Sequence, residues 1–119
     1  MVNQLRIIIV LFSIVFVSCS QIPTELQTAE ALLKTKPDSV LSILQHLQPE
    51  ILKSESNRAL YGLLLFQALD RNNQTLQPDS IINFSVNYYQ KNNYKRELGI
   101  GYYYKARLYK RAQRFDEAT

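Results

Sequence analysis

The chain has 119 residues, with 14 Lys and Arg against 10 Asp and Glu, and a net charge of +4 at pH 7. Its length fits one small domain, and a hydrophobic fraction of 46% is ordinary for a folded protein, which excludes a disordered or collagen-like chain. Three Gly, four Pro and no Trp leave few tight turns and little room for Gly-rich phosphate loops. The composition therefore favours a mostly helical chain.

The first 18 residues have the features of an export signal. Arg6 supplies one positive charge, and an apolar run interrupted only by Ser13 follows over residues 7–17. A stable membrane-spanning helix needs about 20 residues, so a run of this length is typical of the hydrophobic part of a signal peptide. The alternatives are an ordinary secretory signal and an N-terminal membrane helix lengthened by its flanking residues.

Cys19 is the only cysteine, and it directly follows Phe16-Val17-Ser18. This placement resembles the lipobox of bacterial lipoproteins, in which the cysteine thiol receives a diacylglycerol and becomes the first residue after cleavage. The resemblance implies a signal peptide over residues 1–18, a lipidated tether over 19–24 and acyl chains that hold the protein on a bacterial membrane. No acidic run follows Cys19, so we expect a cell-envelope protein that faces the periplasm.

From Glu25 onward, apolar residues recur at helical spacing between short breaks. Pro37 ends the first predicted helix, and its fixed φ suits the first turn of the second, which ends before Pro49. The third predicted helix, over about 55–70, is apolar around so much of its surface that it should be central in the fold.

The polar, Asn-rich stretch 71–77 predicts a loop, and a fourth helix follows from Pro78. A second break at 92–94 precedes a fifth helix over about 95–112. One stripe of this helix is expected to pack inward. Its residues are Leu98, Tyr102, Ala106, Tyr109 and Ala112.

The segment from Pro37 to Leu41 recurs from Pro78 to Ile82, an offset of 41 residues, as expected for stacked helical hairpins. Residues 113–115 are expected to turn, and Asp116 to begin a sixth, incomplete helix. The end of the chain also resembles a tetratricopeptide repeat, whose bulky, small, aromatic, aromatic and Ala positions are matched by Tyr102, Ala106, Tyr109, Phe115 and Ala118. The resemblance implies an all-α fold of antiparallel helical hairpins, stacked as a short, divergent TPR-like solenoid over residues 25–119.

Four features together resemble the N-terminal region of bacterial tetratricopeptide-repeat lipoproteins. They are Cys19, the Lys36–Ser39 turn, the Arg58–Leu64 helix and the Asn87–Tyr89 helix end. Such proteins usually continue through more repeats, so we expect this chain to be a fragment whose last repeat is incomplete. The resemblance implies a membrane-anchored, noncatalytic scaffold that binds a protein or peptide. The alternative is the periplasmic input region of a longer signal-transduction or transcription-regulating protein.

No catalytic motif emerges from the sequence. His46 is the only histidine, and a lone imidazole without cysteine partners does not make a standard zinc site. Asp38 and Asp79 lie at predicted helix starts, where a carboxylate stabilises free N–H groups. We therefore expect a solvent-facing histidine, no enzyme activity, no cofactor and no metal.

Two features of residues 91–114 point to recognition. This stretch contains eight Lys and Arg and a single acid, Glu97. The basic residues form either a phosphate-binding stripe, a solvated face opposite the Tyr102 stripe, or a surface attracted to anionic lipid. Tyr103 and Tyr104 cannot both point inward together with Tyr102, so one of the two is a candidate for a concave peptide-binding surface. We predict Tyr103, Lys105 and Arg107 as partner contacts. Nucleic acid is not expected as a ligand, because such a role needs a cytosolic protein and a processed export signal would carry this chain out of the cytosol.

We expect replacement of the predicted lipid-bearing thiol to abolish membrane attachment. Intact mass spectrometry of the membrane fraction should show a wild-type species that lacks residues 1–18 and carries acyl mass, and Cys19→Ala should lack that species. An unprocessed, unmodified wild-type chain would contradict the prediction.

Overall fold

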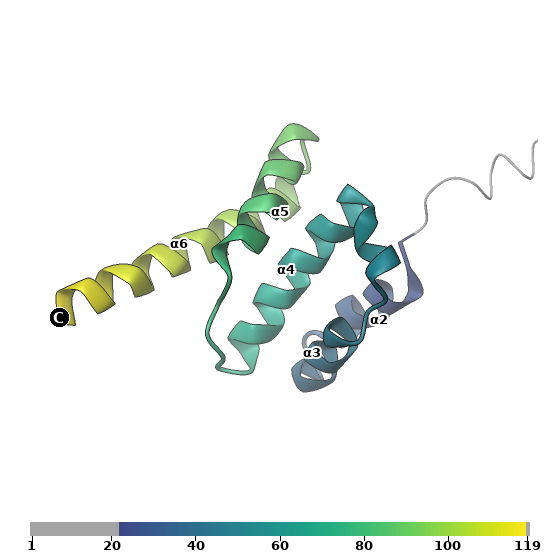
Figure 1. The fold of residues 1–119 in the computed structure, drawn as a ribbon, viewed down its shortest axis with the longest axis horizontal. Coiled ribbons are helices and arrows are strands. Elements are labelled where there is room, and N and C mark those ends of the chain that lie inside the picture. The colour runs from purple at the N-terminus through teal and green to yellow at the C-terminus, as the bar shows by residue number, and fades with distance from the viewer. Residues whose placement is uncertain (1–21, 119) are drawn as a thin grey trace, which may run out of the picture.

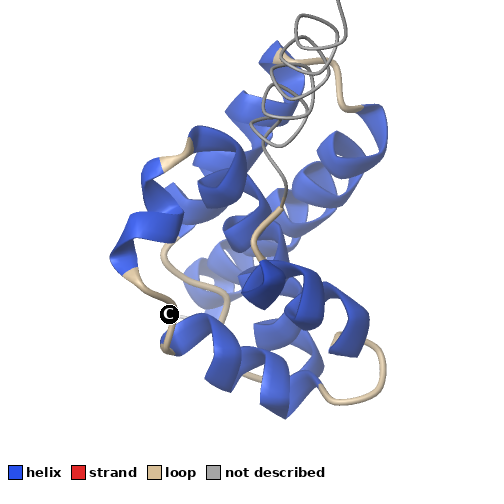
Figure 2. Cartoon of the chain, turned by 90° about the vertical axis from the view of Figure 1, so that its right-hand side faces the viewer, coloured by secondary structure: helices blue, strands red, loops and turns tan. Residues whose placement is uncertain are grey.

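The computed structural model describes residues 22–118, with side chains as far as Arg111. This part of the chain is all-helical and contains no strand, which confirms the all-α part of the prediction (Figure 2). The helices are α2 (Thr24–Leu32), α3 (Pro37–Gln45), the 3-10 helix η1 (Pro49–Lys53), α4 (Glu55–Arg71), α5 (Asp79–Lys91) and α6 (Lys95–Ala118). Cys19 and the predicted signal peptide lie outside the described residues.

Helix α4 is the centre of the fold, as its sequence predicts. Consecutive helices pack on each other, and α4 contacts α2 and α6 as well as its neighbours in the chain (Figure 1). One core cluster joins α2, α3 and α4, to which α4 contributes Leu64 and Ala68. A second joins α4, α5 and α6, to which α4 contributes Ala59, Leu63 and Phe66. Because α4 buries apolar residues on two sides, its hydrophobic pattern extends around most of the helix.

Helices α4 and α5 approach closely at Gly62. A Cβ at Gly62 would overlap Ser85 Oγ and lie 3.1 Å from the Ile81 carbonyl oxygen. Ser85 is completely buried, and its hydroxyl donates a 2.7 Å hydrogen bond to the Ala59 carbonyl oxygen of α4. The glycine therefore makes room for a polar contact that joins the two helices.

Helices α4 and α5 end in the same way, with an asparagine in the left-handed region. Asn73 has φ 56° and Asn93 has φ 60°. After α5, the N–H of Asn93 donates to the Gln90 carbonyl oxygen and the N–H of Tyr94 to the Tyr89 carbonyl oxygen, at 3.4 and 3.0 Å. This bonding pattern is the Schellman motif, with asparagine where glycine is most common. It gives a physical cause for the breaks predicted at 71–77 and 92–94.

The helices begin where the sequence predicts, and the two aspartates lie inside the first turns and not at the N-cap positions. Pro37 is the first residue of α3, and Asp38 and Asp79 lie in the first turns of α3 and α5. The residues at the N-cap positions of both helices make no side-chain cap hydrogen bond. A carboxylate in the first turn lies near the positive end of the helix dipole, which stabilises it. His46 is exposed, as predicted, with Nδ1 2.7 Å from the Ser42 carbonyl oxygen.

The expected turn at residues 113–115 and the sixth helix are both wrong. Helix α6 runs without interruption to Ala118, and its last turns project beyond the other helices (Figure 1). The reason lies in the local sequence, because residues 110–118 contain no Gly, Pro or Asn that would stop a helix.

The inward face predicted for α6 is also wrong. Tyr102 and Tyr109 are 47% and 63% exposed, whereas Tyr104 is only 7% exposed. The buried stripe runs through Leu98, Gly101, Tyr104 and Leu108. A Cβ at Gly101 would lie 2.8 Å from Val86 Cγ2, so the glycine lets α6 approach α5 with this stripe inward.

We expect Gly62→Ala to lower the free energy of unfolding by about 1–3 kcal/mol, because the added methyl displaces Ser85 or Ile81 from a packed interface. The matched control is Gly99→Ala in α6, where a Cβ meets nothing within 4 Å. That change should raise stability by up to about 1 kcal/mol through helix propensity. Urea unfolding followed by circular dichroism measures both, and equal shifts in the two variants would show that Gly62 makes no special contact.

Candidate binding groove

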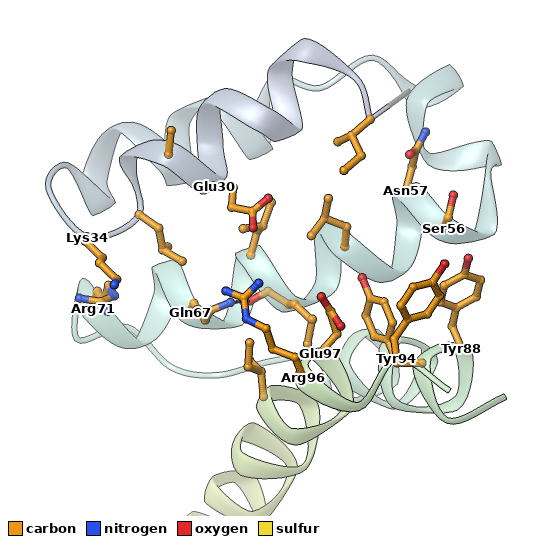
Figure 3. Close-up of a pocket in the computed structure, with 18 residues that line it drawn as sticks. Glu30, Lys34, Ser56, Asn57, Gln67, Arg71, Tyr88, Tyr94, Arg96 and Glu97 are labelled. Atoms are coloured by element: carbon orange, nitrogen blue, oxygen red, sulfur yellow. Dashed lines mark hydrogen bonds between the residues drawn. The ribbon is translucent and has the colours of Figure 1, made fainter. Parts of the chain in front are cut away.

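A groove with a cavity volume of about 510 Å³ lies between α2, α4 and the junction of α5 with α6 (Figure 3). Its volume is within the range of roughly 300–1,000 Å³ that is usual for ligand sites. The groove follows α4 lengthwise, because residues at i, i+4, i+7, i+11 and i+15 of one helix share a face. On α4 these are Ser56, Leu60, Leu63, Gln67 and Arg71.

The floor of the groove is apolar in its middle. Leu60, Leu63 and Leu64 of α4 supply it, and Leu33, directly after α2, and Ile100 of α6 also line the groove. Leu63 and Leu64 also belong to the two core clusters, so packing on both sides of α4 holds the floor in place.

Three tyrosines form one end of the groove, beside Ser56 and Asn57 (Figure 3). The rings of Tyr88 and Tyr94 are nearly parallel, at 11° with centroids 6.5 Å apart. Tyr89 lies edge-on to both, with its centroid 5.3 Å from that of Tyr88 and 5.9 Å from that of Tyr94. Tyr94 comes directly after the left-handed Asn93, so the Schellman motif at the end of α5 places its ring in this cluster.

Charged side chains line the rest of the groove. Lys34 and Arg71 lie together at the end opposite the tyrosines, and Glu30, Arg96 and Glu97 lie between the two ends (Figure 3). None of these five takes part in an ion pair among the side chains described up to Arg111. The two ends therefore differ in character, one aromatic and the other basic.

Burial perturbs the ionisation of tyrosines in and beside the groove. Burial raises the pKa of the Tyr89 hydroxyl, and the carboxylate of Glu97 raises it further, because both disfavour a phenolate. Burial also raises the pKa of Tyr104 to about 12, with a further contribution from the nearby Asp70 carboxylate. Both hydroxyls are therefore protonated at neutral pH.

The three predicted contact residues on α6 do not line the groove. Tyr103 is 57% exposed, and its ring lies edge-on to that of Tyr104 at 5.0 Å. The Arg107 guanidinium forms an ion pair with Asp70 of α4 and lies 5.9 Å from the centroid of the Tyr103 ring. Lys105 is half-buried and is joined to neither. Thus Tyr103 and Arg107 come together on α6, and Lys105 stands apart.

The basic side chains of α6 do not all share one environment. Arg107 forms an ion pair with Asp70 of α4, whereas Lys110 is exposed, and so are Tyr102 and Tyr109. The groove residues that sequence reasoning missed include Lys34 and Arg71, whereas Arg96 belongs to the basic stretch 91–114 that the sequence singled out. The signal for the floor was present on α4, where the stripe from Ser56 to Arg71 changes from polar to apolar and back to polar.

Among the residues described, no group of His, Cys, Asp and Glu side chains is placed to hold a metal ion. No helix in the described part of the chain has the length and hydropathy of a membrane span. Comparison with family models, curated proteins and solved structures found no match to the chain.

We expect the stability of the protein to fall between about pH 10 and about pH 12. In this interval the tyrosines of the unfolded chain lose their protons, while Tyr104, with a pKa of about 12, keeps its proton in the native state. The stabilisation is complete below about pH 10 and is lost as the pH rises through about 12. In Tyr104→Phe the free energy of unfolding should fall less steeply over this interval than in the wild type. Urea titrations at several pH values measure both slopes, and parallel slopes would contradict the assignment.

Proposed function

We propose that the chain is a noncatalytic peptide-binding scaffold of the tetratricopeptide type, held at a bacterial membrane through Cys19. The observation that carries the binding function is the open groove over α4, with its apolar floor, its tyrosines at one end and its basic side chains at the other. An apolar surface framed by a few charged and aromatic side chains suits an extended peptide or a helix laid along it.

The packing order of the helices supports a TPR-like arrangement. Helices α2 with α3, and α4 with α5, are sequential packed pairs, and the first helix of each pair contacts the first helix of the next, α2 with α4 and α4 with α6. A stack of helical hairpins requires both kinds of contact. The groove runs beside α2, α4 and the start of α6, the first helices of these pairs.

The membrane attachment is supported by the sequence alone. An apolar run too short to span a bilayer, followed at once by the only cysteine, is the pattern that lipid modification uses. A binding module tethered in this way would display its groove at the surface of the membrane, in the periplasm.

The groove can be tested by narrowing it without disturbing the core. Ala31 and Thr28 are both exposed on α2, but only Ala31 lines the groove. We expect the immobilised full chain, purified in detergent, to enrich peptides with apolar residues from a displayed library of random heptapeptides. Ala31→Gln should reduce this enrichment by about tenfold, because the longer side chain occupies the groove, and Thr28→Gln should not. Equal enrichment by both variants, or none by the wild type, would refute the proposed function.

A further inference from the structure

We propose that the groove is polarised and selects peptides with an acidic side chain at one end and an aromatic side chain at the other. The acidic group would lie beside Lys34 and Arg71, and the aromatic group beside Tyr88 and Tyr94. This inference rests on the proposed function and adds the charge, order and length of the ligand.

The basic end combines two cations from different helices. Lys34 follows the end of α2, Arg71 is the last residue of α4, and both side chains are exposed at the same end of the groove (Figure 3). No ion pair among the side chains described up to Arg111 includes either of them. Two neighbouring positive charges repel each other, and a carboxylate placed between them would be attracted by both.

The acid nearest to Arg71 in sequence is already engaged elsewhere. Asp70 precedes Arg71, but its carboxylate pairs with Arg107 of α6. It contributes no carboxylate to the lining of the groove. The carboxylates that do line the groove, Glu30 and Glu97, share its middle with Arg96 (Figure 3). The positive charge at the Lys34 end is therefore left for a ligand.

The tyrosine end suits an aromatic or apolar side chain. Tyr94 is 51% exposed, so part of its ring is free to contact a ligand, and Tyr88 and Tyr89 support it from the side. Aromatic groups gain from edge-on and offset contacts with such rings in addition to the area they bury. The partly exposed Leu60 continues the apolar surface toward the basic end, with the almost fully buried Leu63 and Leu64 beneath it.

The length of α4 between the two ends sets the length of the ligand. Ser56 and Arg71 are 15 residues apart, which corresponds to about 22 Å along a helix that rises 1.5 Å per residue. An extended peptide advances about 3.3 Å per residue, so about seven residues cover that span. The acidic and aromatic side chains should therefore be separated by about five residues.

The test uses a labelled heptapeptide, blocked at both termini, with phenylalanine at one end, glutamate at the other, and alternating leucine and serine between. Peptides of the reverse order, and with glutamine in place of glutamate, complete the set. Fluorescence anisotropy with the full chain in detergent should show about three- to tenfold tighter binding of glutamate than of glutamine in one of the two orders. The preference should disappear at high salt, where charge attraction is screened.

Charge-reversal variants locate the effect. Lys34→Glu combined with Arg71→Glu should abolish the preference for glutamate over glutamine. The control combines Lys53→Glu with Lys110→Glu, two exposed lysines outside the groove, and should keep the preference. Equal binding of the glutamate and glutamine peptides by the wild type would overturn the polarity while leaving a peptide-binding groove intact. Binding of neither peptide, or loss of the preference in the control, would also overturn it.

Discussion

The arrangement of this protein depends on one helix that buries apolar residues on both of its flanks. Helix α4 supplies Leu64 and Ala68 to the core with α2 and α3, and Ala59, Leu63 and Phe66 to the core with α5 and α6. A helix of this kind is held from two directions, and the strip from Ser56 to Arg71 faces the groove. That strip is the floor of the groove, so the surface that would receive a ligand is among the best-supported surfaces of the fold.

The ends of the helices determine what stands around that floor. The chain leaves α5 through the left-handed Asn93, and the two hydrogen bonds of the Schellman motif place Tyr94 against Tyr88 and Tyr89. At the other end, α2 stops at Leu32, which brings Lys34 into the following turn, beside the last residue of α4. Local backbone chemistry thus positions Tyr94 at the aromatic end, whereas the basic end also depends on the packing of α2 on α4.

Much of the fold was accessible from sequence, because apolar spacing and stop signals are local properties. Pro37, the Asn pairs and the broad apolar surface of α4 gave correct helix positions and a correct central helix. The inward face of α6 was mispredicted because two stripes of the helix have helical spacing. The close approach of Gly101 to Val86 favours the stripe with Tyr104, and such a contact between helices is invisible in a local pattern. The groove escaped prediction for the same reason, since Lys34 and Arg71 are far apart in sequence and meet only when α2 packs on α4.

Arg107, predicted as a partner contact, forms an ion pair between two helices. Its ion pair with Asp70 joins α6 to the end of α4, and its guanidinium also lies near the exposed ring of Tyr103. The side chains of Asp70 and Arg107 are 22% and 32% exposed, so the ion pair is partly shielded from solvent. It therefore contributes more to stability than a fully solvated ion pair would. The same pair removes a carboxylate from the neighbourhood of Arg71. Arg107 therefore does not line the groove, but it affects the charge there. Because Asp70 pairs with Arg107, the adjacent Arg71 is the charge that remains available to a ligand.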